Sequence, residues 1–202
     1  MDYDIAQFEE KLIELSDLER LGFGICLLER ALPMFYAFQA ETNHAGMGEV
    51  MASLAACWKT MEDGRWGEPA FLTSNECEKV MPDSEDYDSF YTSAALDAVD
   101  ICCSLLDFIH AKDIRSIVAA TQVQLDTLDL ATQRLLDEDG VGDDHRLVQG
   151  PTSLLSLELN RMQDDLFFLA ASSAQSEPLA SQLRRRVLEL NYRQIELIRR
   201  AE

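Results

Sequence analysis

Residues 18–38 read LERLGFGICLLERALPMFYAF, and this stretch decides the fold. Steps of three and four residues separate its apolar side chains, which are Leu18, Leu21, Ile25, Leu28, Leu32 and Phe35. Such steps return to one side of an α-helix, so the pattern predicts a long helix with a continuous apolar stripe. Ser16 precedes the stripe and Glu19 follows three residues later, which is the pattern of a capping box that starts a helix.

Residues 89–111 predict the second central helix. Apolar residues occur on most of its sides: Ala94, Ala95, Ala98, Val99, Ile101, Leu105, Leu106, Phe108 and Ile109. A helix that is apolar nearly all round belongs in the middle of a bundle. We therefore expect the helices around 18–38 and 89–111 to form the core.

The rest of the chain shows the same helical period and no run of alternating β-branched residues. Residues 1–202 therefore predict a single all-α domain, a bundle of seven or eight helices. Two stretches that contain glycine predict flexible loops: 63–73, which also contains Pro69, and the polar 139–151.

The chain is acidic, with 17 Lys and Arg against 37 Asp and Glu and a formal net charge of −20. Such a body repels phosphate backbones and anionic lipid surfaces, so we expect no membrane partner. Segment 181–202 is the exception, since it holds six Arg and three Glu. We expect this basic helix to contact the acidic remainder or a second copy, which favours a homodimer. The candidate contact residues are Arg184, Arg185, Arg186 and Arg193.

The five cysteines predict a reducing compartment. Their number is odd, no Cys-x-x-Cys occurs, and Cys102 and Cys103 are adjacent, whereas secreted disulfide frameworks have even counts. The N-terminal Met-Asp-Tyr-Asp also lacks the basic start and apolar run of a signal peptide. We therefore expect a cytoplasmic protein.

One face of the helix around 89–111 carries acids and a histidine. Asp97, Asp100 and Asp107 share this face, and His110 follows Asp107 by one helical turn. Di-iron bundles use an acid and a histidine at this spacing, so Asp100, Asp107 and His110 are candidate ligands for a divalent metal. The alternative is a solvated acidic stripe, and on that interpretation no cofactor is expected.

Glu29 and Arg30 interrupt the apolar stripe of the first central helix. A charge placed there must be partly buried and therefore paired. We expect an Asp from the acidic helix to pair with Arg30, in a structural rather than a catalytic ion pair.

Two blocks of the sequence also resemble a known family. They are residues 18–38, with Glu29-Arg30-Ala31-Leu32-Pro33 at the centre, and Met81-Pro82-Asp83-Ser84-Glu85-Asp86-Tyr87-Asp88 followed by Ala95-Leu96-Asp97-Ala98. Their order and spacing resemble the YjaG-like bacterial proteins, a family of unknown function. The resemblance implies an all-helical cytosolic protein without an assigned activity. It singles out Glu29, Arg30, Asp86, Asp88 and Asp97 as family-typical polar positions.

These observations leave three hypotheses about function. The first is a non-enzymatic interaction or structural protein that self-associates. The second is a helical bundle that binds a metal or a small molecule through the Asp/His cluster. The third is nucleic-acid binding through the basic C-terminal helix. No motif of an enzyme active site supports catalysis.

Overall fold

The computed structural model describes residues 5–67, 73–139, 153–172 and 175–188. Within these ranges it contains helices and no strand, which confirms the all-α prediction. The helices are α1 (Ile5–Glu14), α2 (Asp17–Thr42), α3 (Met47–Asp63), α4 (Ser74–Glu78), α5 (Thr92–Ala111), α6 (Ile114–Asp139), α7 (Leu154–Ser172) and a further helical segment, 179–188. Of the two expected loops, residues 64–67 are not helical, whereas 68–72 and 140–151 lie outside the described residues.

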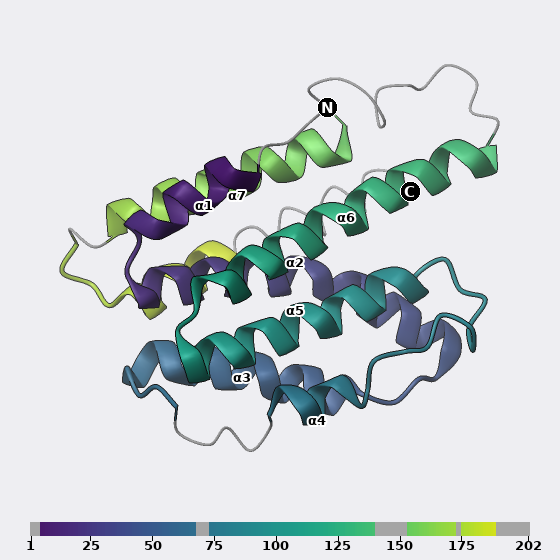
Figure 1. The fold of residues 1–202 in the computed structure, drawn as a ribbon, viewed down its shortest axis with the longest axis horizontal. Helices are drawn as coiled ribbons and strands as arrows, with labels where there is room; N and C mark the ends of the chain where they lie inside the picture. Colours follow the sequence, from purple (N-terminus) through teal and green to yellow (C-terminus); the bar gives the residue numbers. More distant parts are fainter. Residues whose placement is uncertain (1–4, 68–72, 140–152, 173–174, 189–202) are drawn as a thin grey trace.

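Helices α2 and α5 form the centre of the bundle, as predicted (Figure 1). Helix α2 contacts α3, α5, α6 and α7, so it is enclosed on most sides. The predicted stripe faces inward, because Leu21, Ile25, Leu28, Leu32 and Phe35 are all buried. Helix α5 begins at Thr92 rather than at Ser89, because Ser89 accepts the backbone N–H of Tyr91 in a turn.

The capping box at the start of α2 is confirmed. The backbone N–H of Ser16 donates to the Glu19 carboxylate at 2.6 Å, and the Glu19 N–H donates to the Ser16 hydroxyl at 3.4 Å. Two of the backbone donors that a helix start leaves open are thus satisfied by side chains. This local contact separates α2 from α1.

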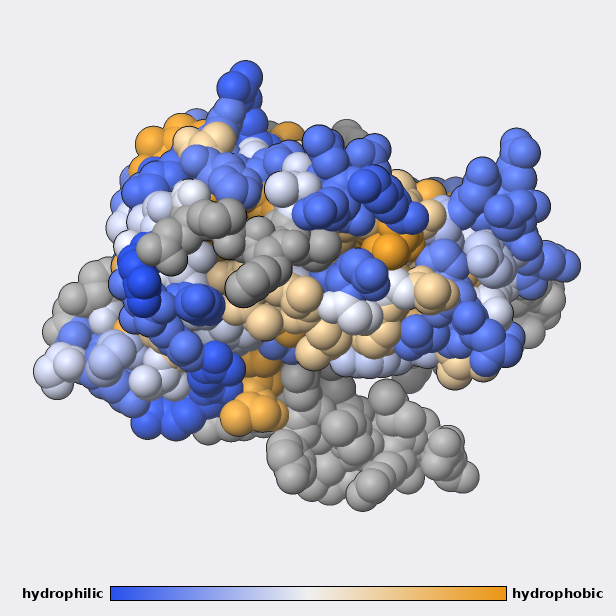
Figure 2. All heavy atoms as spheres, turned by 90° about the horizontal axis from the view of Figure 1, so that it is seen from below, coloured by the Kyte–Doolittle hydropathy of each residue, from blue (hydrophilic) through white to orange (hydrophobic). Residues whose placement is uncertain are grey.

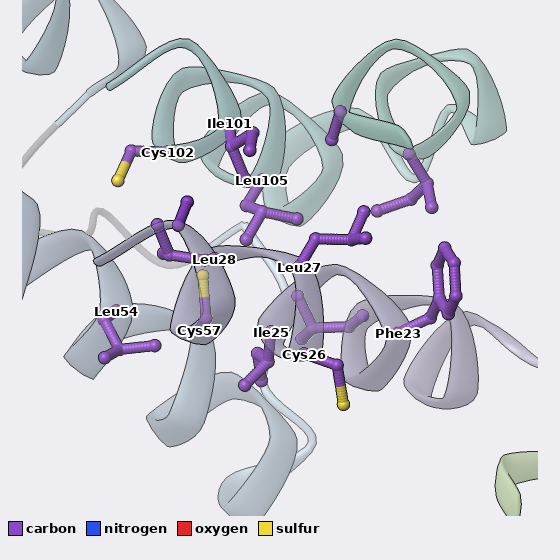
Figure 3. Packing of buried hydrophobic residues seen from close by; sticks show 14 of the residues in the cluster. Phe23, Ile25, Cys26, Leu27, Leu28, Leu54, Cys57, Ile101, Cys102 and Leu105 are labelled. Carbon is purple, nitrogen blue, oxygen red and sulfur yellow. The ribbon is translucent and has the colours of Figure 1, made fainter. Parts of the chain in front are cut away.

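Glycine allows α2 to approach α5 closely. A Cβ atom on Gly24 would lie 2.2 Å from Cδ2 of Leu105 on α5. Figure 3 shows Leu105 and Ile101 of α5 above Leu27 and Leu28 of α2. The central helices therefore pack through a position where any larger residue would collide.

His44 connects the end of α2 to the chain between α4 and α5. Its ring nitrogens lie 2.9 Å from the Tyr87 hydroxyl and 2.9 Å from the Val80 carbonyl oxygen. The rings of Phe38 and Tyr87 pack against the imidazole. Both nitrogens of His44 are therefore occupied by contacts within the chain.

An 18-residue window of α2 reaches a mean hydropathy of 1.4, so by length and composition this helix could span a membrane. However, 67% of that window is buried inside the protein. Burial against neighbouring helices is the environment of a central bundle helix, and it accounts for the hydropathy of α2.

Candidate functional site

A buried network of ion pairs joins α2 and α7 in the described part of the chain. Arg30 donates from Nε to Glu158 Oε1 at 2.6 Å and from Nη1 to Asp165 Oδ2 at 2.5 Å. The second oxygen of Asp165 accepts two hydrogen bonds from Arg186, at 2.8 and 2.9 Å. Nη1 of Arg161 lies 3.8 Å from Oε2 of Glu158. Three arginines thus surround two carboxylates.

The centre of this network is shielded from water. The side chains of Arg30, Glu158 and Asp165 are 8%, 4% and 1% exposed. Burial alone would lower the pKa of Arg30, but the charges of Glu158 and Asp165 outweigh it and raise that pKa above its ordinary value. The guanidinium therefore stays charged, and its compensation depends on both acids.

Helix α7 explains why both acids reach one arginine. Glu158 and Asp165 are seven residues apart, so they lie within about 20° of each other around the helix. They share the buried side of α7 with Met162, Leu166 and Leu169. Two acids inside an apolar stripe were the signal in the sequence that could have identified Asp165.

The expected pairing of Arg30 with an Asp of the acidic helix is wrong. Asp97 on α5 instead accepts a hydrogen bond from the Thr127 hydroxyl of α6 at 2.7 Å, so it faces α6 while Arg30 faces α7. Asp86 and Asp88 lie exposed between α4 and α5. Glu29 accepts a hydrogen bond from the Trp58 indole at 3.3 Å. The five family-typical positions therefore do not converge on one site.

A cavity of about 1040 Å³ lies beside the network, between α2, α3, α6 and α7. Apolar side chains make up much of its wall: Leu32, Met34, Met51, Leu54, Leu128 and Leu154. Arg30, Glu158 and Arg161 bring the ion network to its edge. We call this cavity the groove.

Two buried polar atoms of groove residues have no hydrogen-bond partner among the described residues. They are Nη2 of Arg30, which is a donor, and Oε1 of Gln124, which is an acceptor. An unsatisfied buried polar atom costs about 1–3 kcal/mol, so native proteins rarely leave one without a reason. Arg30 and Gln124 thus each combine a position in the groove lining with one buried polar atom that the described residues leave without a partner.

The charge around the groove differs from that of the whole chain. Its lining contains four cations, Arg30, Lys59, Arg161 and Arg184, and three anions, Glu29, Glu62 and Glu158. This lining has a small positive balance in a chain of net charge −20. On the face seen in Figure 2, hydrophilic side chains cover most of the surface around smaller apolar patches.

The arginine run at 184–186 is neutralised within the chain. Arg184 donates to Glu62 at 2.5 Å and stacks on Trp58, Arg185 donates to Glu177, and Arg186 donates to Asp165. These contacts agree with the expectation that the basic helix lies against the protein's own acidic residues. Arg193, the fourth predicted contact residue, lies outside the described residues.

The acidic face of α5 is more exposed to solvent than the ion network is. Asp107 and His110 are exposed, and Asp100 is half-buried. Burial, and then the charge of Glu78, raise the pKa of Asp100. No group of three or more His, Cys, Asp or Glu in the described part of the chain could hold a metal ion.

Comparison with known proteins places the chain in a family. A crystal structure of a DUF416 family protein from Shewanella baltica OS155 matches 91% of this chain and 94% of its own, with a TM-score of 0.74 and 21% sequence identity. At this identity the match shows the shared fold. No curated protein matches the chain. The model of the family described as "Protein of unknown function (DUF416)" matches residues 7–195, and the chain therefore belongs to that family.

Proposed function

We propose that this chain is a binding protein for a small amphipathic anion, which the groove holds with its polar head against Arg30. The observation that carries the proposal is an apolar cavity whose lining includes Arg30, a guanidinium with one nitrogen, Nη2, that has no partner among the described residues. Sites for small molecules are typically concave, mostly apolar and equipped with a few convergent polar groups.

The size of the groove supports a small organic ligand. Its volume of about 1040 Å³ lies just above the roughly 300–1,000 Å³ of ordinary ligand pockets. The methionines Met34 and Met51 in its wall are flexible side chains that adapt to apolar ligands of different shape. This composition favours an aliphatic or aromatic body.

The charges support an anionic head. Nη2 of Arg30 has no hydrogen-bond partner among the described residues, and Lys59 and Arg161 add positive charge to the lining. A carboxylate accepts from a guanidinium in a charge-assisted hydrogen bond, which is stronger than a neutral one.

Trp58 lies in the groove lining, so its fluorescence can report the binding of a ligand there. The chain has two tryptophans, so Trp66→Phe leaves Trp58 as the only reporter. We expect decanoate to change the Trp58 emission saturably, decanol to bind at least about tenfold more weakly, and decyltrimethylammonium to give no change, because hydrogen bonds to charged groups contribute about 1.5–3 kcal/mol. An equal response to all three probes would contradict the anionic head.

A matched pair of variants tests the location. Ala55 lines the groove and Ala52, three residues earlier on α3, does not; both are exposed. We expect Ala55→Phe to abolish decanoate binding and Ala52→Phe to leave it unchanged. Loss of binding in both variants, or in neither, would place the ligand elsewhere.

Self-association is a second candidate, supported by Phe167. This side chain of α7 is 79% exposed, which is unusual for a large aromatic residue. Light scattering after gel filtration, at low and high salt, measures the oligomeric state. We expect a dimer that Phe167→Glu converts to a monomer; a wild-type monomer under both conditions would remove this candidate.

A further inference from the structure

Two contacts between α2 and α3 show how these walls of the groove run. The Trp58 indole donates to Glu29 at 3.3 Å, and the Tyr36 hydroxyl donates to Sδ of Met51 at 3.4 Å. Residue numbers on α3 fall as those on α2 rise, so the two helices are antiparallel. All four residues line the groove, which therefore extends along both helices from the Glu29–Trp58 contact to the Tyr36–Met51 contact.

Helix α7 also runs antiparallel to α2. Near the start of α2, a Cβ atom on Gly22 would lie 3.0 Å from Cδ2 of Leu169. Later on α2, Arg30 pairs with Glu158, which precedes Leu169 in the sequence. Leu154 lies about one further turn along α7 in the same direction. This leucine therefore lines the groove on the side of the later residues of α2.

The groove is charged at one end and apolar at the other. On α2, Glu29 and Arg30 are charged, whereas the four later lining residues are not. On α3, Lys59 and Glu62 are charged, whereas the lining residues that precede Trp58 are not. Because the two helices are antiparallel, their uncharged parts lie on the same side of the groove. We call this side the apolar end and the other side the charged end.

Tyr36 and Met51 lie at the apolar end. They are the lining residues of α2 and α3 that are farthest in sequence from the charged ones. Their side chains contact each other from opposite helices, through the hydrogen bond between hydroxyl and sulfur. They are 46% and 39% exposed, so this pair lies where the groove meets solvent.

The distance between Arg30 and this pair suits an alkyl chain of medium length. Tyr36 follows Arg30 by six residues, which corresponds to about 9 Å along α2 at about 1.5 Å per residue. An extended chain covers about 1.2 Å per bond, since the three backbone bonds of an extended peptide residue span about 3.3–3.6 Å. A tail of about eight bonds therefore reaches from a head at Arg30 to Tyr36, which is close to the length of decanoate.

We propose that Tyr36 and Met51 set the tail length of the bound ligand, and that the groove takes unbranched medium-chain carboxylates. This inference rests on the proposed function and adds the residues that determine specificity for the tail. Each methylene buried before the pair should strengthen binding by up to about fourfold. Methylenes beyond the pair stay in solvent and should add little.

A series of carboxylates tests the tail length in the Trp66→Phe background, with each probe kept monomeric. From octanoate to decanoate, we expect the affinity measured by Trp58 emission to rise about tenfold. From decanoate to tetradecanoate, it should rise by less than about threefold, which we call the plateau. A rise that continues through tetradecanoate would overturn this inference and leave the decanoate site standing. No response to decanoate would overturn the proposed function and this inference together.

Substitutions at the pair test which residues cause the plateau. Ala40 and Met47 lie about one turn beyond Tyr36 and Met51, so removing the ring should open further apolar surface to the tail. In Tyr36→Ala, tetradecanoate should therefore bind at least about tenfold more tightly than decanoate. Met51→Ala should shift the ratio in the same direction, and it provides a second test if Tyr36→Ala does not fold.

Two control variants separate this effect from general changes at the surface. Tyr36→Phe keeps the ring and should keep the plateau. Phe167→Ala removes an exposed aromatic side chain of α7 that does not line the groove, and it should also keep the plateau. A plateau that persists in folded Tyr36→Ala and Met51→Ala, or that disappears in Phe167→Ala, would overturn the inference.

Discussion

The ion network of Arg30 and the acidic face of α5 contain similar residue types but differ in how they are assembled. The network joins residues 128 and 135 positions apart in sequence, buries them, and borders the groove. The α5 face repeats acids along one helix and leaves Asp107 and His110 exposed. The spacing of acids along one helix was therefore enough to identify the acidic face of α5 from the sequence. The candidate site could not be identified in this way, because its residues come from helices that meet only in the folded bundle.

The largest expected effect is at Asp165, which compensates both Arg30 and Arg186. We expect Asp165→Asn to lower the free energy of unfolding by about 3–5 kcal/mol, because it leaves buried positive charge without its partner. Urea denaturation measures this difference. The neighbouring exposed Asp164 is the control, and Asp164→Asn should change stability by less than about 0.5 kcal/mol. Equal effects of the two variants would show that the buried Asp165 contributes no more to the free energy of unfolding than the exposed Asp164 does.

The contrast between buried and open positions can also be tested with substitutions that change no charge. Gly24→Ala should destabilise the protein by about 1–3 kcal/mol, because the added methyl would collide with Leu105 in the core. Gly48 on α3 has open space around it, so Gly48→Ala should stabilise by about 0.5–1 kcal/mol through helix propensity. Thermal melts should therefore shift in opposite directions. A stabilising Gly24→Ala would contradict the close approach of α2 and α5.

Asp100 gives a smaller effect that depends on pH. Burial, and then Glu78, raise its pKa in the folded protein, so folding favours the protonated form. The wild type should therefore lose stability as pH rises from the ordinary Asp value of about 3.9 through the folded pKa. Asp100→Asn lacks this loss and should be more stable at pH 7, by less than about 1 kcal/mol because solvent screens the half-buried carboxylate. Parallel stability curves for the two proteins across this pH range would refute the prediction.

The smallest effect is expected at the exposed end of the α5 face. Asp107→Ala and His110→Ala should each change stability by about 0.5 kcal/mol or less. Melting temperatures measured with and without Mn²⁺ or Zn²⁺ should coincide in the wild type and both variants. A metal-induced rise in the wild type that His110→Ala removes would establish the metal interpretation of this face.

Local and periodic features of the fold were predictable from the sequence. The capping box of Ser16 and Glu19, the buried stripe of α2 and the central position of α5 depend on neighbours within a few residues or on one helical period. The partner of Arg30 was not predictable in this way. It depends on which helix packs against that side of α2, and acids on both α5 and α7 were available.

The groove and the burial of Cys77 were likewise not predictable from hydrophobic periodicity. Gln124 and Trp58 have no unusual sequence context, and they become notable only because the groove brings them near Arg30. Cys77 was the cysteine with the least apolar surroundings in the sequence, yet in the folded chain it is fully buried. Both arrangements result from contacts between helices, which hydrophobic periodicity does not specify.

The hydrogen bonds of the His44 imidazole also determine which ring nitrogen carries the hydrogen. A carbonyl can only accept, so the hydrogen of the neutral ring must lie on Nε2 facing Val80, and Nδ1 must accept from the Tyr87 hydroxyl. One tautomer thereby joins the end of α2 to two points of an otherwise irregular segment. This segment and the last turn of α2 should consequently open together as one cooperative unit in native-state hydrogen exchange, rather than fraying independently.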